Sequence, residues 1–146
     1  MNTLTKLKFS ALLHDIGKPI CWAESKGFTR HAYYTEQLVS KFLGGEIAET
    51  AKRHHSSQYY ESAFKPRSGL EKIISLADNI ASGADRPEEA YKRRVIPHLP
   101  IALTHPLSTG DPIRRYDSED LLKIVEAVEE VLTEVKELLS KDEERA

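Results

Sequence analysis

The sequence predicts an all-α protein, a bundle of helices closed by one long C-terminal helix. Two patterns support this prediction. Apolar residues recur at spacings of three and four through the first half of the chain, as they do along one face of an α-helix. A longer repeat near the end of the chain follows a heptad pattern. Because 146 residues is the usual length of one domain, we expect residues 1–146 to form a single domain.

The first two helices are expected at residues 3–16 and 30–43, and each is followed by glycine. Gly17 and then Pro19 follow the first segment, and both residue types commonly end a helix. The pair "GG" follows the second segment. The apolar residues that carry the two repeats are Leu4, Leu7, Ala11 and Leu12, and then Ala32, Leu38, Val39, Phe42 and Leu43.

Two further helices are expected before residue 83. The first of them is short and covers residues 46–55, "EIAETAKRHH". The second starts at the capping box "SGLE", in which Ser68 caps the helix and Glu71 reaches back to the backbone of the capping residue. It is expected to continue to about residue 82, because a glycine follows there.

The rest of the chain divides into a connection at 95–116 and a C-terminal helix at 117–141. The connection is rich in proline and is expected to be extended, with a short strand at 101–103. The apolar seam of the helix fits two interpretations, packing on its own domain or docking another domain or chain. The seam consists of Leu121, Val125, Val128, Leu132, Val135 and Leu139, and Ile124, Val131 and Leu138 widen it.

Composition and charge exclude several classes of protein. The net charge of −2 provides no overall basic field, so any contact with nucleic acid must come from a local patch. The single cysteine, Cys21, allows no internal disulfide, which is typical of a reducing cytosol, and we expect a cytoplasmic protein. Charged residues interrupt the N-terminal segment "MNTLTKLKFSALLHDIGK", so neither a signal peptide nor a membrane span is expected.

Histidine and aspartate residues recur in a fixed relation to the expected helices. A His-Asp pair ends the first helix, a histidine opens the second, a His-His pair ends the third, and an aspartate lies among apolar residues of the fourth. A buried carboxylate is costly unless something pairs with it, and a metal ion would do so. A helical bundle can bring such ligands together. The candidates are His14, Asp15, His31, His54, His55 and Asp78.

Several of these residues also have an ordinary explanation. Asp78 could pair with Lys72 or Arg86 on the surface, and His31 could be a polar residue of a first helical turn. Lys18, which follows a glycine, could be a solvated charge near a helix end. The occurrence of all the motifs in one order favours a metal site over chance.

The order of the motifs resembles the HD superfamily of metal-dependent phosphohydrolases. The elements "HDIGK", "HH" and "LADNIASG" are most similar to the N-terminal HD domain of the large subunit of type III CRISPR effectors, the Cas10 family. The resemblance covers roughly residues 4–90 and implies an HD-domain helical bundle around a metal site.

Two departures from the HD pattern stand out. Ordinary HD proteins have a further metal-binding histidine upstream of the HD pair, but none of the 13 residues before His14 is a histidine. This agrees with a circularly permuted HD domain, as in the type III large subunit, with a replacement ligand from downstream. His98 and His105 are the candidates, and His105 is preferred. The segment "GADRPEE" at 83–89 differs from a "GERE"-like sequence common in the family. We expect this difference to alter a rim and to leave the metal site intact.

The resemblance implies two metal ions bridged by a catalytic Asp15, and Lys18 beside the phosphate oxygens of a substrate. His14 and Asp78 would hold one ion, and the other three histidines would hold the second. Such an imidazole-rich set suits manganese, nickel, cobalt or iron better than magnesium or calcium, and Mn²⁺ is the expected ion.

The preferred function is metal-dependent cleavage of single-stranded DNA in CRISPR antiviral defence. The expected partners are single-stranded DNA and other domains or subunits of a type III CRISPR ribonucleoprotein complex. Two alternatives are an HD phosphohydrolase of a small nucleotide and a non-catalytic assembly module with a vestigial HD site. The candidate DNA contacts are Lys52, Arg53, Lys65 and Arg67, and Tyr33, Tyr34, Tyr59 and Tyr60 could stack on bases or be half-buried surface.

Overall fold

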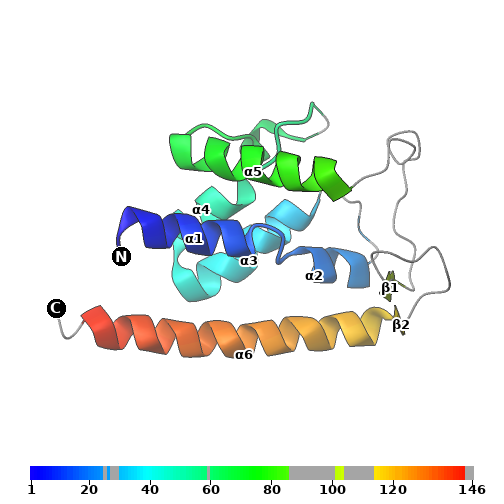
Figure 1. Cartoon of the computed structure of the whole chain (residues 1–146). Helices are drawn as coiled ribbons and strands as arrows, with labels where there is room; N and C mark the ends of the chain where they lie inside the picture. Colours follow the sequence, from blue (N-terminus) through cyan, green and yellow to red (C-terminus); the bar gives the residue numbers. More distant parts are fainter. Residues whose placement is uncertain (25, 27–29, 59, 86–100, 104–113, 144–146) are drawn as a thin grey trace.

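The fold is all-α, as predicted, apart from one small sheet (Figure 1). The computed structural model describes residues 1–24, 26, 30–58, 60–85, 101–103 and 114–143, and all statements below concern these residues. In Figure 1, α6 runs along one side of the molecule, α1 and α2 lie next to it, and α5 lies on the opposite side. The elements are α1 (Thr3–Leu13), α2 (Lys18–Ala23), α3 (His31–Leu43), α4 (Gly45–Lys52), the 3-10 helix η2 (Ser62–Phe64), α5 (Gly69–Asp85), β1 (Ile101–Leu103), β2 (Arg114–Tyr116) and α6 (Ser118–Glu143).

The first helix ends three residues before the expected end at 16, and a turn at residues 14–17 leads into a second helix. α1 begins where the side chain of Asn2 accepts a hydrogen bond from the backbone N–H of Thr5 at 2.9 Å, and it ends at Leu13. The sequence interpretation missed α2, because it took Pro19 only as a stop. Pro19 lies in the first turn of α2, where a missing N–H breaks no helical hydrogen bond.

α3 begins at His31 and ends at Leu43, close to the predicted 30–43, and Gly44 caps it. Gly44 has a φ of 88°, a left-handed conformation that glycine adopts without strain, so the chain turns there directly into α4. α4 ends at Lys52, three residues before the predicted end at 55, because the capping residue Arg53 has left helical geometry. The consequence is that the two adjacent histidines lie just beyond α4 and not within it.

The capping box and the short strand are confirmed. The backbone N–H of Glu71 donates to Oγ of Ser68 at 3.3 Å, and the carboxylate of Glu71 accepts from the backbone N–H of Ser68 at 2.8 Å. The strand β1 covers residues 101–103, as predicted, and pairs in antiparallel register with β2, which the sequence interpretation had placed within the extended connection.

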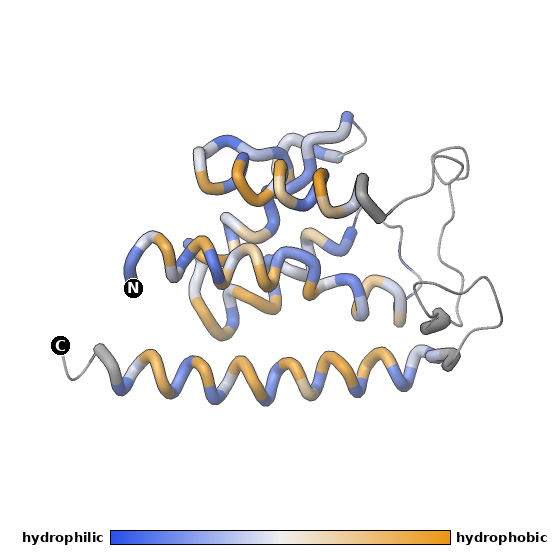
Figure 2. Tube along the Cα trace, viewed as in Figure 1, coloured by the Kyte–Doolittle hydropathy of each residue, from blue (hydrophilic) through white to orange (hydrophobic). Residues whose placement is uncertain are grey.

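α1, α3, α4 and α6 contribute side chains to one apolar core, and the seam of α6 packs on its own domain. Val128 packs against this core, so one of the two predicted interpretations of the seam is confirmed. Apolar residues recur along α6 (Figure 2), and those that widen the seam remain 39% to 62% exposed, so docking through them stays a prediction. The buried core residues are Leu13, Leu38, Val39, Ile47, Ala48 and Leu132.

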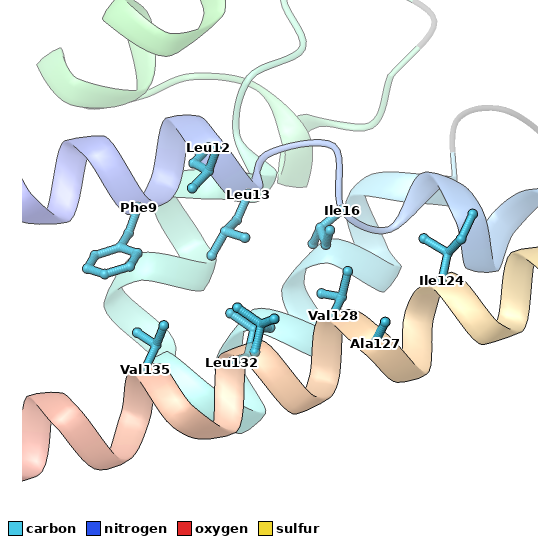
Figure 3. A pocket seen from close by; sticks show the side chains of 10 residues that line it. Phe9, Leu12, Leu13, Ile16, Ile124, Ala127, Val128, Leu132 and Val135 are labelled. Carbon is cyan, nitrogen blue, oxygen red and sulfur yellow. The ribbon is translucent and has the colours of Figure 1, made fainter. Parts of the chain in front are cut away.

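An open groove with a volume of about 460 Å³ lies between α1 and α6 (Figure 3). Its lining is apolar throughout, with Phe9 and Leu13 facing Leu132 and Val135 across it. Because it contains no charged or polar side chain, the groove is unsuited to phosphate chemistry. None of the described helices combines the length and the apolar character that crossing a membrane requires.

Candidate metal centre

The His-Asp pair lies in the turn between α1 and α2, and α3 holds this turn in place. The hydroxyl of Thr35, on α3, donates to the backbone carbonyl of His14 at 3.0 Å and accepts from the backbone N–H of Gly17 at 3.0 Å. Thr35 is fully buried, so its hydroxyl satisfies two backbone groups that water does not reach. The turn is therefore fixed against the same helix that carries His31.

Gly17 makes this close approach feasible. A Cβ atom added at Gly17 would stand 2.2 Å from the carbonyl oxygen of His31 and 2.5 Å from the backbone nitrogen of Thr35. Both contacts involve backbone, which has no room to move aside. The glycine of "HDIGK" is thus required for packing against α3, in addition to any role in ending α1.

The carboxylate of Asp15 occupies the middle of the cluster. Its Oδ2 lies 3.3 Å from Nε2 of His14, and its Oδ1 lies 3.3 Å from Nε2 of His31 and 3.6 Å from Nε2 of His54. The ammonium group of Lys18 also donates a hydrogen bond to Oδ2. One carboxylate oxygen therefore faces the imidazole of His14, and the other faces those of His31 and His54.

His54 and His55 enter the cluster from the end of α4. Nε2 of His55 lies 2.8 Å from Nε2 of His31, and Nε2 of His54 lies 3.5 Å from the same atom. The backbone N–H of His55 donates to the carbonyl of Phe64 at 3.3 Å, which ties the segment after α4 to η2. His31 and His54 are each only 1% exposed, so neither is an ordinary surface residue.

Backbone carbonyls set the tautomers of two of the histidines. Nδ1 of His14 lies 2.6 Å from the carbonyl of Ala11, and Nδ1 of His54 lies 2.7 Å from the carbonyl of Ala51. Since a carbonyl can only accept, we assign the proton to Nδ1 in both rings. The lone pair of each ring is then on Nε2, which points to Asp15, and this is the arrangement of metal-binding histidines.

Asp78 reaches the cluster from α5. Its Oδ1 lies 3.6 Å from Nε2 of His14 and accepts a hydrogen bond from the hydroxyl of Ser82 at 3.3 Å. The alternative partner Arg86 lies outside the described residues. The structure thus brings together all six candidate ligands from the sequence, and their binding of an ion stays a prediction.

The cluster fits a divalent metal ion. Two groups of side chains each offer ligand atoms within 4.8 Å of one another, and His54 belongs to both. Nε2 of His14 and Oδ1 of Asp15 are buried without a hydrogen bond of acceptable geometry to any described residue, although oppositely charged or imidazole groups stand 3.3–3.6 Å away. A cation would satisfy both atoms at once. The two groups are His31, His54 and His55, and His14, Asp15 and His54.

The protonation states of His54 and His55 suit metal binding. Burial raises the pKa of Asp15, but its polar contacts with Lys18 and three imidazoles outweigh this effect and hold the pKa well below its usual range. Burial lowers the pKa of His54, and burial together with the charges of His54 and His31 lowers the pKa of His55 to about 2. Both rings are therefore neutral near pH 7, the form in which imidazole coordinates a metal. Burial by itself would lower the pKa of His14. The neighbouring carboxylate of Asp15 outweighs burial and raises this pKa.

The structure places the candidate DNA contacts differently from the expectation. Lys52 is 8% exposed and pairs with Glu36 at 2.5 Å and Glu49 at 2.7 Å. Arg53 is 5% exposed, pairs with Glu49 at 2.5 Å and donates to the carbonyls of residues 62 and 65 at 3.2 Å. These contacts join α3, α4 and η2, and a role of either cation in binding DNA stays a prediction.

The remaining candidates divide into accessible and inaccessible residues. Lys65 is half-buried and Arg67 is exposed, so both remain available to a phosphate backbone. Tyr60 is 9% exposed and stacks on an imidazole of the cluster, so it offers no free face to a base. Tyr33 is 43% exposed, whereas Tyr34 is half-buried and donates to Glu24. Tyr59, His98 and His105 lie outside the described residues.

Thr35 and Tyr60 are functional candidates that the sequence interpretation missed or misjudged. Thr35 lies four residues after His31, which places it one helical turn further along α3, but nothing in the pattern indicates that its hydroxyl reaches the turn at 14–17. Tyr60 was expected either to stack on bases or to be half-buried surface, and neither interpretation places it against His55. Neither contact is local in sequence, so periodicity and spacing carry no signal for them.

The fold and the site define a class of helical proteins built around a histidine and aspartate metal centre. Residues 2–83, more than half of the chain, match the HD domain family, and the chain belongs to this family. The resemblance inferred from the motifs is therefore confirmed, while the circular permutation and the replacement histidine stay predictions.

The chain is also similar to two curated proteins, each described as a CRISPR system single-strand-specific deoxyribonuclease Cas10/Csm1 of subtype III-A. It is 36% identical to the protein of Enterococcus italicus over 92 residues, which cover 59% of this chain and 12% of the relative. It is 37% identical to the protein of Methanocaldococcus jannaschii over 100 residues, which cover 58% of this chain and 11% of the relative. No solved structure shows a significant match to the chain.

Proposed function

We propose that the chain is a metal-dependent phosphodiesterase that cleaves single-stranded DNA. The observation that carries this proposal is the position of Asp15, whose two carboxylate oxygens face separate imidazole groups at 3.3 Å. A carboxylate in this position suits bridging two ions, and centres with two metals are common among enzymes that cleave phosphodiesters.

In this proposal, His14 and Asp78 hold one ion, and His31, His54 and His55 hold the second. When bound, two such ions supply an activated water and offset the charge that develops on the phosphate. Asp15 orients both groups, and the hydrogen bonds of His14 and His54 to backbone carbonyls keep their Nε2 atoms directed inward. Lys18, which pairs with Asp15, would place its positive charge next to a non-bridging oxygen of the bound phosphate.

The choice of metal follows from the donor atoms. Four imidazoles and two carboxylates form a mixed nitrogen and oxygen set, which suits Mn²⁺, Fe²⁺, Co²⁺ or Ni²⁺ better than ions that prefer oxygen throughout. We propose Mn²⁺ as the physiological ion. The neutral state of His54 and His55 favours the same ions, because no proton has to leave these rings before binding.

The proposed substrate and setting rest on similarity to longer proteins. Both curated relatives are described as single-strand-specific deoxyribonucleases of a type III-A CRISPR system, and this chain corresponds to about a tenth of each. We propose that the chain acts on the same substrate, in the cytoplasm, with other domains or subunits of such a complex. Arg67 and Lys65 supply accessible cations for the phosphate backbone, and Tyr33 supplies an exposed aromatic ring.

A nuclease assay with defined metals tests the proposal. Metal-free protein is supplied with Mn²⁺, Ni²⁺, Co²⁺, Mg²⁺ or Ca²⁺ and offered single-stranded DNA, duplex DNA, RNA or nucleoside triphosphates. Cleavage of single-stranded DNA with the transition metals, lost in Asp15→Asn and retained in the surface control Glu130→Gln, is the expected result. Hydrolysis of nucleotides alone would establish a small-nucleotide phosphohydrolase, and no metal binding would establish a non-catalytic module.

A further inference from the structure

Tyr60 forms one wall of the metal centre. Its ring lies parallel to the imidazole of His55, with centroids 3.7 Å apart and planes inclined by 11°, and it meets His31 edge-on at 6.3 Å. Tyr60 is 9% exposed, so the contact is shielded from water. Among the described aromatic side chains, this is the one that stacks on a candidate ligand face to face.

The backbone on either side holds the two stacked rings in place. The N–H of Tyr60 donates to the carbonyl of Ser57 at 3.3 Å, which closes a turn that returns the tyrosine over His55. The N–H of His55 donates to the carbonyl of Phe64 at 3.3 Å. The backbone of His55 is thus fixed from η2, and its ring is fixed from the turn at residue 60.

His55 differs from His14 and His54 in how its ring is oriented. His14 and His54 each direct Nδ1 to a backbone carbonyl, at 2.6 Å and 2.7 Å. The described hydrogen bond of the His55 ring is the one at 2.8 Å to His31, itself a candidate ligand. The flat face of Tyr60 therefore orients His55 as a backbone carbonyl orients His14 and His54. Mutation of groups that support a metal ligand in this way typically lowers metal affinity by roughly 10- to 100-fold.

Only one of the two ligand groups contains His55. The first group consists of His31, His54 and His55, and the second of His14, Asp15 and His54. A change that frees the ring of His55 should weaken binding to the first group and leave the second as it is. A general loss of protein stability would weaken metal binding at both groups. It can therefore be distinguished from a change that acts through His55 alone.

We propose that Tyr60 is a positioning residue that orients His55 and thereby sets the affinity of one of the two metal sites. The inference rests on the proposed function, because it requires that the cluster binds two ions. It assigns to Tyr60 a role through His55, without contact between Tyr60 and the ion or the substrate.

The experiment counts ions and measures their affinities by calorimetric titration of metal-free protein with Mn²⁺, and follows the visible spectrum with Co²⁺. The parent and Tyr60→Phe, which keeps the stacked ring, should bind two ions with the same affinities. Tyr60→Leu should bind one ion as the parent does and the other at least about tenfold more weakly, with a changed Co²⁺ spectrum. Phe9→Leu serves as a control that loses core packing without touching the cluster.

The outcomes distinguish the role of Tyr60 from the proposal that the cluster binds two ions. Two ions weakened equally in Tyr60→Leu, or two ions unchanged, would overturn the role of Tyr60 while leaving the two-metal proposal in place. A parent protein that binds fewer than two ions would overturn the proposed function itself. If Tyr60→Leu does not fold, Tyr60→Met, which keeps more side-chain volume without a ring, decides the question in the same titration.

Discussion

The backbone of Gly17 lies against the backbone of His31, so closely that a Cβ atom on Gly17 would stand 2.2 Å from the carbonyl oxygen of His31. The first residue belongs to the turn that carries His14 and Asp15, and the second opens α3. The approach of these two segments sets the distance between the ligands that they carry.

Replacing Gly17 with alanine should destabilise the protein and disturb the centre. The added methyl group would clash with backbone atoms of His31 and Thr35, so we expect the free energy of unfolding to fall by about 3 kcal/mol. Denaturant unfolding measures this change. Gly69→Ala is the matched control, because no atom lies within 4 Å of a Cβ at that position, and it should leave stability unchanged or slightly higher. Equal stability of the two variants would contradict the role of Gly17.

Replacing Thr35 with valine should cost more than replacing it with serine. Valine keeps the shape but removes the hydroxyl that bonds His14 and Gly17, which leaves two buried backbone groups without a partner, at a cost of about 1–3 kcal/mol. Serine keeps the hydroxyl and should retain most of the stability and the metal affinity. Thr50→Val provides the control, because the Thr50 hydroxyl only returns to the carbonyl of Glu46 within α4. Similar losses of stability in Thr35→Val and Thr50→Val would contradict a special role for the two hydrogen bonds of the Thr35 hydroxyl.

Adding Mn²⁺ should raise the melting temperature of the parent protein but not that of Asp15→Asn. A ligand that binds only the folded state stabilises it in proportion to its concentration and affinity. Without metal, the amide should disturb the cluster, because Lys18 loses a charged acceptor and His14 and His31 then face a neutral group. Thermal unfolding at several Mn²⁺ concentrations measures the difference, and an equal shift in both proteins would rule out Asp15 as a ligand.

Lys52→Ala should affect stability and not the electrostatics of DNA binding. The lysine is buried between Glu36 and Glu49, so its loss leaves two carboxylates close together and should destabilise the protein by roughly 1–3 kcal/mol. The dependence of DNA affinity on salt should keep the slope of the parent. Arg67→Ala, at an exposed position, should reduce that slope by about one charge instead. A reduced slope in Lys52→Ala would restore the lysine to the DNA interface.

Glu49→Gln should flatten the loss of stability in acid. Burial raises the pKa of Glu49, but Lys52 and Arg53 outweigh it and lower the pKa. The carboxylate therefore stabilises the fold above its ordinary pKa of about 4.5, and this contribution disappears as the pH falls through the lower folded value. Because the side chain is 43% exposed, we expect an effect of only about 0.5 kcal/mol at pH 7. Denaturant unfolding from pH 7 to pH 3 tests this, and parallel curves for the two proteins would refute it.

Features that depend only on residues close together in the chain could be predicted from the sequence. The capping box of Ser68 and Glu71 formed as predicted, because its hydrogen bonds join residues three apart. The repeat of α6 gave a long helix with one face on the core, because helical periodicity alone decides which side chains share a face. The six candidate ligands could also be selected from the sequence, because the selection required only their side-chain chemistry and their order along the chain.

Tertiary structure decided which side chains meet and which way they point. Lys52 and Lys65 carry the same charge, but of these two only Lys52 is buried between carboxylates from α3 and α4. The contacts of Thr35 with the turn at 14–17 and of Tyr60 with His55 likewise depend on how segments pack. Sequence spacing defines the face of one helix, but the partner of that face is set by the free energy of the whole packed chain.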